Sequence, residues 1–438
     1  MNTLHTLMTV PAAIVLGGVC VTQAQGAPPV VIETVTVGNP GNAGDPQGQQ
    51  GTFGAVDHVF AVGKYEVTAG QYTAFLNAVA ATDTHGLYHT RMDYDADPSR
   101  NGCNIKRHGA SGSYTYSVAP DWADRPVNYV SWADAARFAN WLHNGQPTGP
   151  QDLTTTEDGS YFLDGIFENN DEQLEDVVRK PDATWVIPTE NEWYKAAYHE
   201  NDGVTGNYWN FPTRADNGVS HELIDPDPGN NATCSGGTVG DWTIGAPYYR
   251  TEVGAHENSA SPYGTFDQGG NVQEFNETVP EPDIRGIRGG SWFWGISQLG
   301  VWARDLFMHS SDQFDDLGFR VALLVGTDVT NLRGFDPDAT YFQWDPMLGA
   351  SGTIYDYDLV RGDVANLSGN ASEVDLGTLT CIENDSQDES SDASPDTETP
   401  ALNTAYFYLV RFQEGPVIGP WGFGSGGEAR VGTGGCPP

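Results

Sequence analysis

Hydrophobic residues recur with helical spacing in three segments, and each segment is preceded by a pair of polar residues with the spacing of a capping box. The pairs are Thr68 with Gln71, Ser131 with Asp134 and Thr189 with Glu192. The apolar positions expected on the buried faces of the first two helices are Tyr72, Phe75, Leu76 and Val79, and Ala135, Phe138, Ala139 and Leu142. The pattern predicts helices that begin after Thr68, Ser131 and Thr189, the second ending at Asn144-Gly145.

Long loops rich in Gly, Asn, Asp and Pro separate these helices from a few short strands. We expect one strand that ends near Val67 and others around residues 284–292 and 318–324. Few regular elements joined by long loops are typical of an irregular α+β domain whose loops carry the function.

The pattern changes after Val325, where alternating hydrophobic and polar residues predict strands over 339–346, 353–362 and 404–412. Turn clusters between these strands are typical of a small β-sandwich. An acidic segment, residues 382–400, is expected to be a solvated loop, with calcium binding as the alternative. The predicted organisation is a signal peptide 1–24, a Gly-rich arm 25–54, a first domain 55–325, a linker 326–337 and a second domain 338–438.

The charge balance excludes some partners. The chain carries 20 Lys and Arg against 59 Asp and Glu, a formal net charge of −39. Nucleic acids and anionic membrane surfaces are bound through clustered Lys and Arg, so neither is expected as the main partner.

The first residues have the pattern of a secretory signal. An apolar run from Leu7 to Val21 is followed by small and polar residues ending at Ala24. This run is short for a membrane span, and it predicts cleavage after Ala24 and a secreted, periplasmic or cell-surface protein. Cys20 follows Val19, where a lipoprotein signal needs a small residue, so lipidation is not expected. No later apolar stretch reaches membrane length, so we expect no transmembrane segment in the mature chain.

Four cysteines remain after the predicted cleavage, and none forms a CxxC pair. Four cysteines allow three disulfide connectivities. Cys381 and Cys436 flank the strands of the second domain, which favours a bridge between them. Cys103 and Cys234 would then pair by elimination.

Six ordered segments resemble the formylglycine-generating-enzyme, or sulfatase-modifying-factor, family. They are GKYEVTAGQYTAFLN, RPVNYVSWADAARFANWL, WVIPTENEWYKAA, SPYGTFDQGGNVQEF, IRGGSW and LGFRVA. The resemblance implies a compact, irregular fold related to C-type lectins and stabilised by calcium. On shorter motifs, the tail resembles a fibronectin type III-like module of bacterial secreted proteins.

The resemblance also implies a pair of cysteines after the GGS motif that holds copper and oxidises a sulfatase cysteine. Here Trp294 and Leu299 align with the two thiols, and the stretch from Trp292 to Phe319 contains no cysteine. Both roles need a thiolate, so copper and the oxidase reaction are not expected. Ser291 of GGS has no evident base partner and is interpreted as a turn residue.

Related sulfoxide synthases use iron held by an HxxxHxE motif. His85 and His89 have the HxxxH spacing, but Arg91 stands at the position of the third ligand. Two loop histidines without a ligand role are therefore the preferred interpretation.

Calcium is the cofactor that the resemblance still implies. The Asp267 and Glu274 carboxylates and the Gly270 and Val272 carbonyls would form one site, because calcium takes six to eight oxygen ligands. A second site would begin at Asn207 and Tyr208. The alternative for Asp267 and Glu274 is turn capping and surface charge.

The surface that corresponds to the family's substrate groove would contain Trp292, Trp294, Trp302 and Arg304, with Phe293 and the loop to Phe314. Aromatic faces beside polar groups suit a glycan or an extended peptide. The sequence thus predicts an exported, calcium-stabilised binding module, and the tail would be a spacer or adhesion module. The alternative is a divergent sulfatase-maturing oxidase or related metalloenzyme.

Overall fold

The computed structural model describes residues 29–167, 170–304 and 308–324, and the strand backbones of residues 330–434. The predicted signal peptide and most of the predicted acidic loop fall outside the described residues. In the described part of the chain, no helix is both long and apolar enough to cross a membrane.

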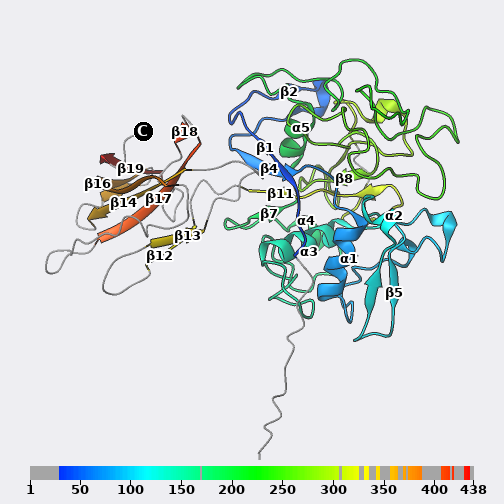
Figure 1. Ribbon diagram of the computed structural model, residues 1–438, viewed down its shortest axis with the longest axis horizontal. Helices are drawn as coiled ribbons and strands as arrows, with labels where there is room; N and C mark the ends of the chain where they lie inside the picture. Colours follow the sequence, from blue (N-terminus) through cyan, green and yellow to red (C-terminus); the bar gives the residue numbers. More distant parts are fainter. Residues whose placement is uncertain are drawn as a thin grey trace, which may run out of the picture.

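A four-stranded antiparallel sheet joins the two ends of the first domain (Figure 1). Its order is β1 (Thr34–Val37), β4 (Phe60–Gly63), β11 (Ala322–Leu323) and β7 (Trp185–Val186). Because β1 pairs along its whole length with β4, the first domain begins before residue 55. The predicted boundary was wrong there: the segment 34–37 is part of the sheet and not of a separate arm. The strand expected to end near Val67 already ends at Gly63.

The three capping boxes are confirmed. They begin helices α1 (Ala69–Val79), α3 (Trp132–His143) and α5 (Glu190–Tyr198). The cap residue that ends α3 is Asn144, as predicted. Every residue predicted for the buried faces of α1 and α3 is buried. Their rings meet in one core, where Phe75 and Phe138 cross edge to face with centroids 5.3 Å apart and Phe319 packs on Phe138 at 5.5 Å.

A three-stranded sheet carries the candidate site, and shorter elements lie in the loops. The sheet has the order β10 (Leu317–Gly318), β8 (Gln273–Phe275) and β9 (Ile287–Arg288). The remaining elements of the first domain are β2 (Asp45–Pro46), β3 (Thr52–Phe53), β5 (Lys106–His108), β6 (Thr115–Ser117), α2 (Pro120–Ala123), α4 (Asp171–Glu175), η1 (Gly48–Gln50), η2 (Thr90–Met92), η3 (Pro98–Arg100) and η4 (Ile296–Gln298).

The tail is all-β in its described part. Its strands are β12 (Thr330–Gly334), β13 (Phe342–Asp345), β14 (Asp356–Asp363), β15 (Ser368–Asn370), β16 (Glu373–Ser386), β17 (Tyr406–Glu414), β18 (Val417–Ile418) and β19 (Ala429–Gly434). They form one two-stranded and one six-stranded sheet. Strands β13, β14 and β17 overlap the three predicted ones. Two expectations were wrong: β12 lies within the predicted linker, and β16 runs to Ser386, past the predicted start of the acidic loop. The β-sandwich and the fibronectin-like resemblance stay predictions.

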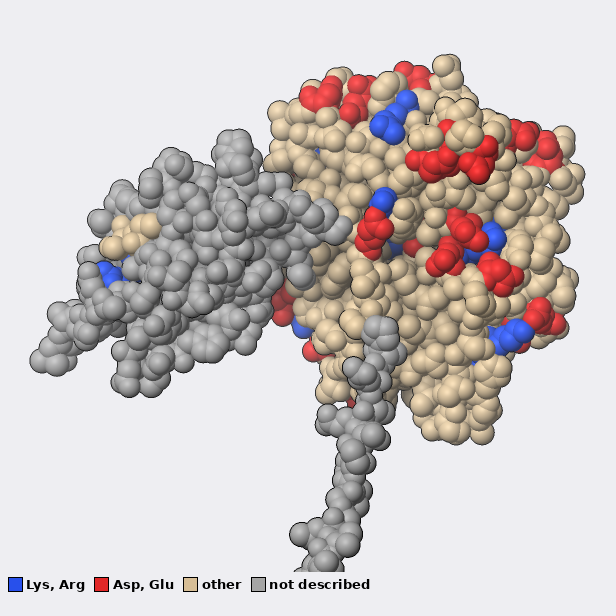
Figure 2. All heavy atoms as spheres, viewed as in Figure 1, with Lys and Arg blue, Asp and Glu red and all other residues tan. Residues whose placement is uncertain are grey.

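The surface of the first domain is acidic. On the face shown in Figure 2, Asp and Glu side chains gather in several patches, and most Lys and Arg side chains lie beside them. Examples are the ion pairs of Lys64 with Glu33 and of Lys106 with Asp95. The few cations are therefore largely paired, as the net charge of −39 leads one to expect.

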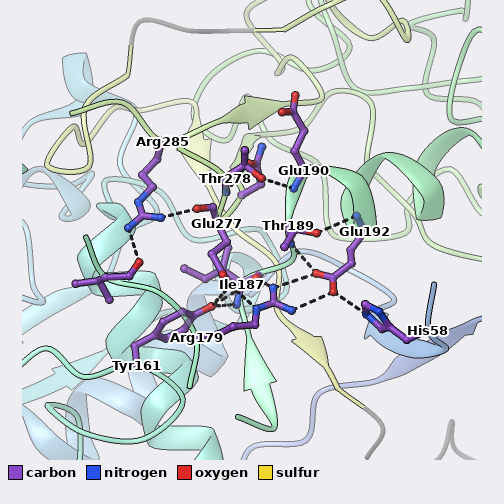
Figure 3. Close-up of polar contacts among 12 residues, drawn as sticks. His58, Tyr161, Arg179, Ile187, Thr189, Glu190, Glu192, Glu277, Thr278 and Arg285 are labelled. Atoms are coloured by element: carbon purple, nitrogen blue, oxygen red, sulfur yellow. Dashed lines mark hydrogen bonds and ion pairs between the residues drawn. The ribbon is translucent and has the colours of Figure 1, made fainter. Parts of the chain in front are cut away.

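A buried ion network fixes the start of α5 (Figure 3). Glu192, the third residue of the helix, accepts two hydrogen bonds of 3.0 Å from the Arg179 guanidinium and lies 2.9 Å from His58 Nε2. Arg179 Nε also donates to Glu277 at 2.6 Å, and the Tyr161 hydroxyl donates to the same Glu277 oxygen. Each carboxylate therefore has an internal cation or donor, which makes this network a structural brace.

Candidate ligand-binding site

Three polar residues meet where the three-stranded sheet ends. Strands β8 and β10 are parallel, with Leu317 opposite Gln273, so Asp316 lies beside the start of β8. Strand β9 is antiparallel to β8, so Ser291, shortly after β9, reaches the same edge. Ser291 Oγ donates to Asp316 Oδ2 at 2.8 Å, and Gln273 Nε2 donates to the same oxygen at 3.3 Å.

Two glycines make the turn that brings Ser291 there. Gly289 and Gly290 have φ values of 100° and 64°, which L side chains rarely adopt. A Cβ at Gly289 would lie 2.8 Å from the Gln268 carbonyl oxygen. The Ser291 hydroxyl also accepts a hydrogen bond from the Phe293 amide. Ser291 thus holds the turn, in agreement with its interpretation as a turn residue.

Five aromatic rings follow one another beside this edge, and we call them the ring strip: Trp242, Tyr249, Trp292, Phe293 and Trp294. Neighbouring ring centroids are 4.6 to 5.9 Å apart. Trp292 is the buried member, with 3% of its surface exposed, and its indole Nε1 has no hydrogen-bond partner. Phe293 and Trp294 are 51% and 38% exposed, so the strip presents ring faces to solvent.

Asp316 is the charged group of the site. It is 8% exposed. Burial raises its pKa to about 6; the nearby Asp315 charge adds to this, while hydrogen bonds from Ser291 and the Trp294 indole oppose it. None of the ion pairs formed by the described residues includes Asp316. The exposed ring of Phe314 lies two residues earlier in the chain.

Two tyrosines near the site have strained backbones. Tyr129 and Tyr249 both have a φ of 56°, in the left-handed region that bulky residues avoid. Tyr249 belongs to the ring strip. The Tyr129 amide donates to the Phe314 carbonyl, and its ring stacks on His89 with centroids 5.2 Å apart. Such strain concentrates at functional sites, and no sequence signal indicated it.

The predicted groove is only partly assembled. Trp292 and Trp294 belong to the ring strip, but Trp302 packs edge to face against Phe211. Arg304 donates two hydrogen bonds, of 2.7 and 2.6 Å, to Glu190. Glu190 also pairs with Arg288, so one carboxylate is shared by two arginines, and the role of Arg304 toward a ligand stays a prediction.

Two clefts lie elsewhere, around the N-terminal segment. Their volumes are 530 and 650 Å³, and Pro29 and Val30 line both. The Gln146 side-chain amide holds Val30 in place through hydrogen bonds of 2.7 and 2.8 Å to its backbone. No residue of the ring strip lines either cleft.

Comparison with known proteins identifies the domain. Residues 35–324 match the family model described as the sulfatase-modifying factor enzyme 1-like domain. The chain belongs to this family. The match contains every residue of the site and leaves the strands from β12 onward outside it.

Solved structures similar to this sulfatase-modifying-factor domain share about a fifth of its residues. CarF is 20% identical, with a TM-score of 0.42 over 67% of this chain and 99% of CarF. Variable protein 1 of Treponema denticola is 19% identical, with a TM-score of 0.40 over 67% and 94%. PvdO from Pseudomonas aeruginosa is 18% identical, with a TM-score of 0.35 over 66% and 91%. No curated protein matches the sequence.

The two carboxylates predicted to hold calcium in the family domain have protein partners, while the part of the Gly270 and Val272 carbonyls stays a prediction. Both Glu274 oxygens accept hydrogen bonds from the buried Arg320, at 2.6 and 2.7 Å, and Trp193 Nε1 adds a third bond. Asp267 accepts a bond of 2.6 Å from the Gly254 amide. A guanidinium therefore takes the place of a metal ion at Glu274, and this loop does not fit calcium ligation by Glu274.

The second predicted calcium site, at Asn207 and Tyr208, stays a prediction. The Asn207 amide donates to Asp202, and the Tyr208 hydroxyl donates to the Ala43 carbonyl. No three His, Cys, Asp or Glu side chains of the described residues converge as metal ligands. His85 lies 3.7 Å from Glu157, whereas His89 caps η2, so these two histidines have different partners.

The cysteines of the family domain are isolated thiols. Cys103 and Cys234 are buried and unpaired, which corrects the prediction that they form a disulfide. Burial raises the pKa of Cys234 to about 12, and Cys234 packs in one apolar cluster with Leu299. Cys436 lies outside the described residues, so its bridge to Cys381 stays a prediction.

Proposed function

We propose that this exported member of the sulfatase-modifying-factor family binds a glycan or an extended peptide at the ring strip and does not oxidise cysteine. The observation that carries the proposal is the surface itself. Where the family resemblance expects one thiol, the exposed ring of Trp294 lies beside Asp316. Where it expects the other, Leu299 is fully buried.

The chemistry of the remaining thiols supports this proposal. Metal binding and mixed-disulfide formation both use the thiolate. Cys234 comes near the second expected position, but a pKa of about 12 keeps it protonated at neutral pH, and it is buried. A single protonated thiol without solvent contact has neither the charge nor the access that the oxidase reaction needs.

The ring strip has the features of a recognition surface. Exposed rings contribute contact area with little loss of side-chain freedom, and they suit sugar faces and extended peptides alike. The carboxylate of Asp316 supplies an acceptor beside them. Apolar stacking would provide affinity, and this carboxylate would fix the orientation of the ligand.

A glycan and peptide array tests the proposal. The wild type should bind a defined set of ligands, and Trp294→Ala should lose them. Phe162→Ala is a matched control, because Phe162 is also an exposed ring but belongs to no part of the site. Array signals that Trp294→Ala retains would contradict the assignment of the site.

The alternative function, a divergent sulfatase-maturing oxidase, has one observation in its favour, which is that Cys234 lies beside Leu299. Peptide mass spectrometry decides between the two. The protein, given copper, oxygen and a sulfatase-type peptide, should leave the peptide cysteine unchanged. Conversion to formylglycine above a no-enzyme control would establish the oxidase instead.

A further inference from the structure

Asp316 is one of the buried carboxylates of the domain that form no ion pair; Glu66 and Asp227 are others, but Asp316 is the one beside the ring strip. The buried carboxylates that bind a cation pair with arginines: Glu157 with Arg137, Glu190 with Arg288, Glu192 with Arg179 and Glu274 with Arg320. Asp316 has only uncharged partners, Ser291, Gln273 and the Trp294 indole. Burying a carboxylate without a counter-charge is costly, so a compensating cation from outside the chain would bind favourably.

The surroundings of Asp316 select the kind of cation. The Trp294 indole donates a hydrogen bond to Asp316, Phe293 packs on Trp294, and Phe314 lies two residues before Asp316 in the chain; all three rings are exposed. An ammonium or quaternary ammonium group is attracted to an aromatic face. The nearby Arg250 is occupied, because its guanidinium donates to the carbonyls of Asn101, Gly102 and Asp315. Arg250 thus makes no ion pair with Asp316, and neither does any other cation among the described residues.

We propose that the ligand of this site carries an alkylammonium group, which binds between the exposed rings of Phe293 and Trp294 and the Asp316 carboxylate. The inference rests on the proposed function and narrows it to ligands with an amine, a lysine side chain or a quaternary ammonium group. A neutral sugar would gain the stacking but would leave Asp316 uncompensated. An anion would be repelled by Asp316.

Choline and its neutral carbon isostere, 3,3-dimethyl-1-butanol, form a matched pair of probes, because they differ only in the charge. Binding is measured by line broadening of the ligand methyl signals in NMR titrations of the full chain at pH 7.5. Choline should bind at least tenfold more tightly than the isostere. Asp316→Asn should remove this preference, and Trp294→Ala should weaken the binding of both probes.

Asp241→Asn is the control variant. Asp241 is a surface carboxylate next to Trp242, and its partner is His221. The variant should bind choline like the wild type. The comparison of choline with its isostere on the wild type stands even if Asp316→Asn fails to fold.

Each outcome decides the inference. Equal binding of choline and the isostere, or no binding of choline at the highest concentration, would overturn it. If array ligands are then still lost in Trp294→Ala, the ring strip remains a binding site for uncharged ligands and the proposed function stands. If the array also shows no ligand that depends on Trp294, both proposals fail.

Discussion

Glu192 and Asp316 are two buried carboxylates whose pKa values shift in opposite directions. Burial alone would raise the pKa of Glu192, but hydrogen bonds and charge from His58 and Arg179 outweigh it and lower the value to about 2. At Asp316 burial prevails and raises the pKa to about 6, because the hydrogen bonds come from uncharged groups. The cost of burying a carboxylate is compensated by cations of the protein at Glu192 and is left uncompensated at Asp316.

This difference in compensation distinguishes the structural brace at Glu192 from the candidate binding site at Asp316. Glu192 lies where α5 begins, and besides the N-cap Thr189 its partners are Arg179 and His58, from two other segments of the chain (Figure 3). Asp316 lies beside exposed rings at the edge of a three-stranded sheet. The fold pairs Glu192 with an arginine, whereas it gives the carboxylate next to the ring strip only uncharged partners.

Removal of Arg179 from the buried ion network should lower the unfolding free energy more than any other change considered below. Arg179→Met leaves Glu192 and Glu277 buried without their shared partner, and breaking a buried ion pair in this way costs about 3–5 kcal/mol. Urea denaturation at pH 7 measures the loss of unfolding free energy. Arg100→Met is the control, because its pair with Asp97 is exposed and its loss should leave the unfolding free energy nearly unchanged. Similar losses in both variants would show that Glu192 does not depend on Arg179.

Asp316 should make the wild type less stable as the pH rises. Its folded-state pKa of about 6 exceeds the ordinary value of 3.8, so its contribution is fully present below pH 3.8 and is lost as the pH rises through 6. Two pKa units correspond to roughly 3 kcal/mol. Asp316→Asn should therefore flatten the decline in unfolding free energy between pH 4 and pH 7.5. An unchanged decline in the variant would place the uncompensated carboxylate elsewhere.

His58 should contribute little to the free energy of unfolding, and only when its ring is protonated. Its hydrogen bond to Glu192 raises its pKa above 6.5 despite partial burial, so the stabilisation is present below pH 6.5 and is lost as the pH rises through the folded-state pKa. His58→Gln should cost less than about 1 kcal/mol at pH 6, since the ring is partly exposed, and still less at pH 8.5. Thermal unfolding at both pH values checks this, and an equal cost at both would exclude a charged His58.

Chelation of divalent ions should have the smallest effect on stability. If Arg320 neutralises Glu274, as its two hydrogen bonds indicate, removal of divalent ions should leave the melting temperature unchanged. Differential scanning calorimetry with EDTA, followed by calcium or magnesium, makes the measurement. A fall of several degrees that calcium restores and magnesium does not would reinstate calcium in this loop and remove the contrast between Glu274 and Asp316.

Local patterns were predictable from the sequence, and long-range pairings were not. Each capping box depends on residues three apart, so Thr68, Ser131 and Thr189 were placed correctly. Arg304 was assigned to the groove because nothing in its neighbourhood revealed that Glu190, far earlier in the chain, would bind it. Strand β1 was missed for the same reason, since its only partner is β4.

The aromatic part of the candidate site could be predicted from the sequence, but its carboxylate could not. The aromatic residues after the GGS turn were visible as a cluster, and Trp292 and Trp294 do lie together. Asp316 was not singled out, because its environment depends on Ser291 and Gln273, which the sheet brings to it. The signal that could have found it is its place directly before the LGFR segment, which must pair within the core.

The parallel pairing of β10 with β8 also sets an order of events during synthesis. The β8–β9 pair is antiparallel and local, so it can form as soon as both strands have left the ribosome. Asp316 and β10 come later in the chain, and a parallel partner must be brought back across the intervening loop before it contributes contacts. The acidic group of the site is thus added near the end of domain folding, and a nascent chain that ends before residue 316 carries the rings without their carboxylate.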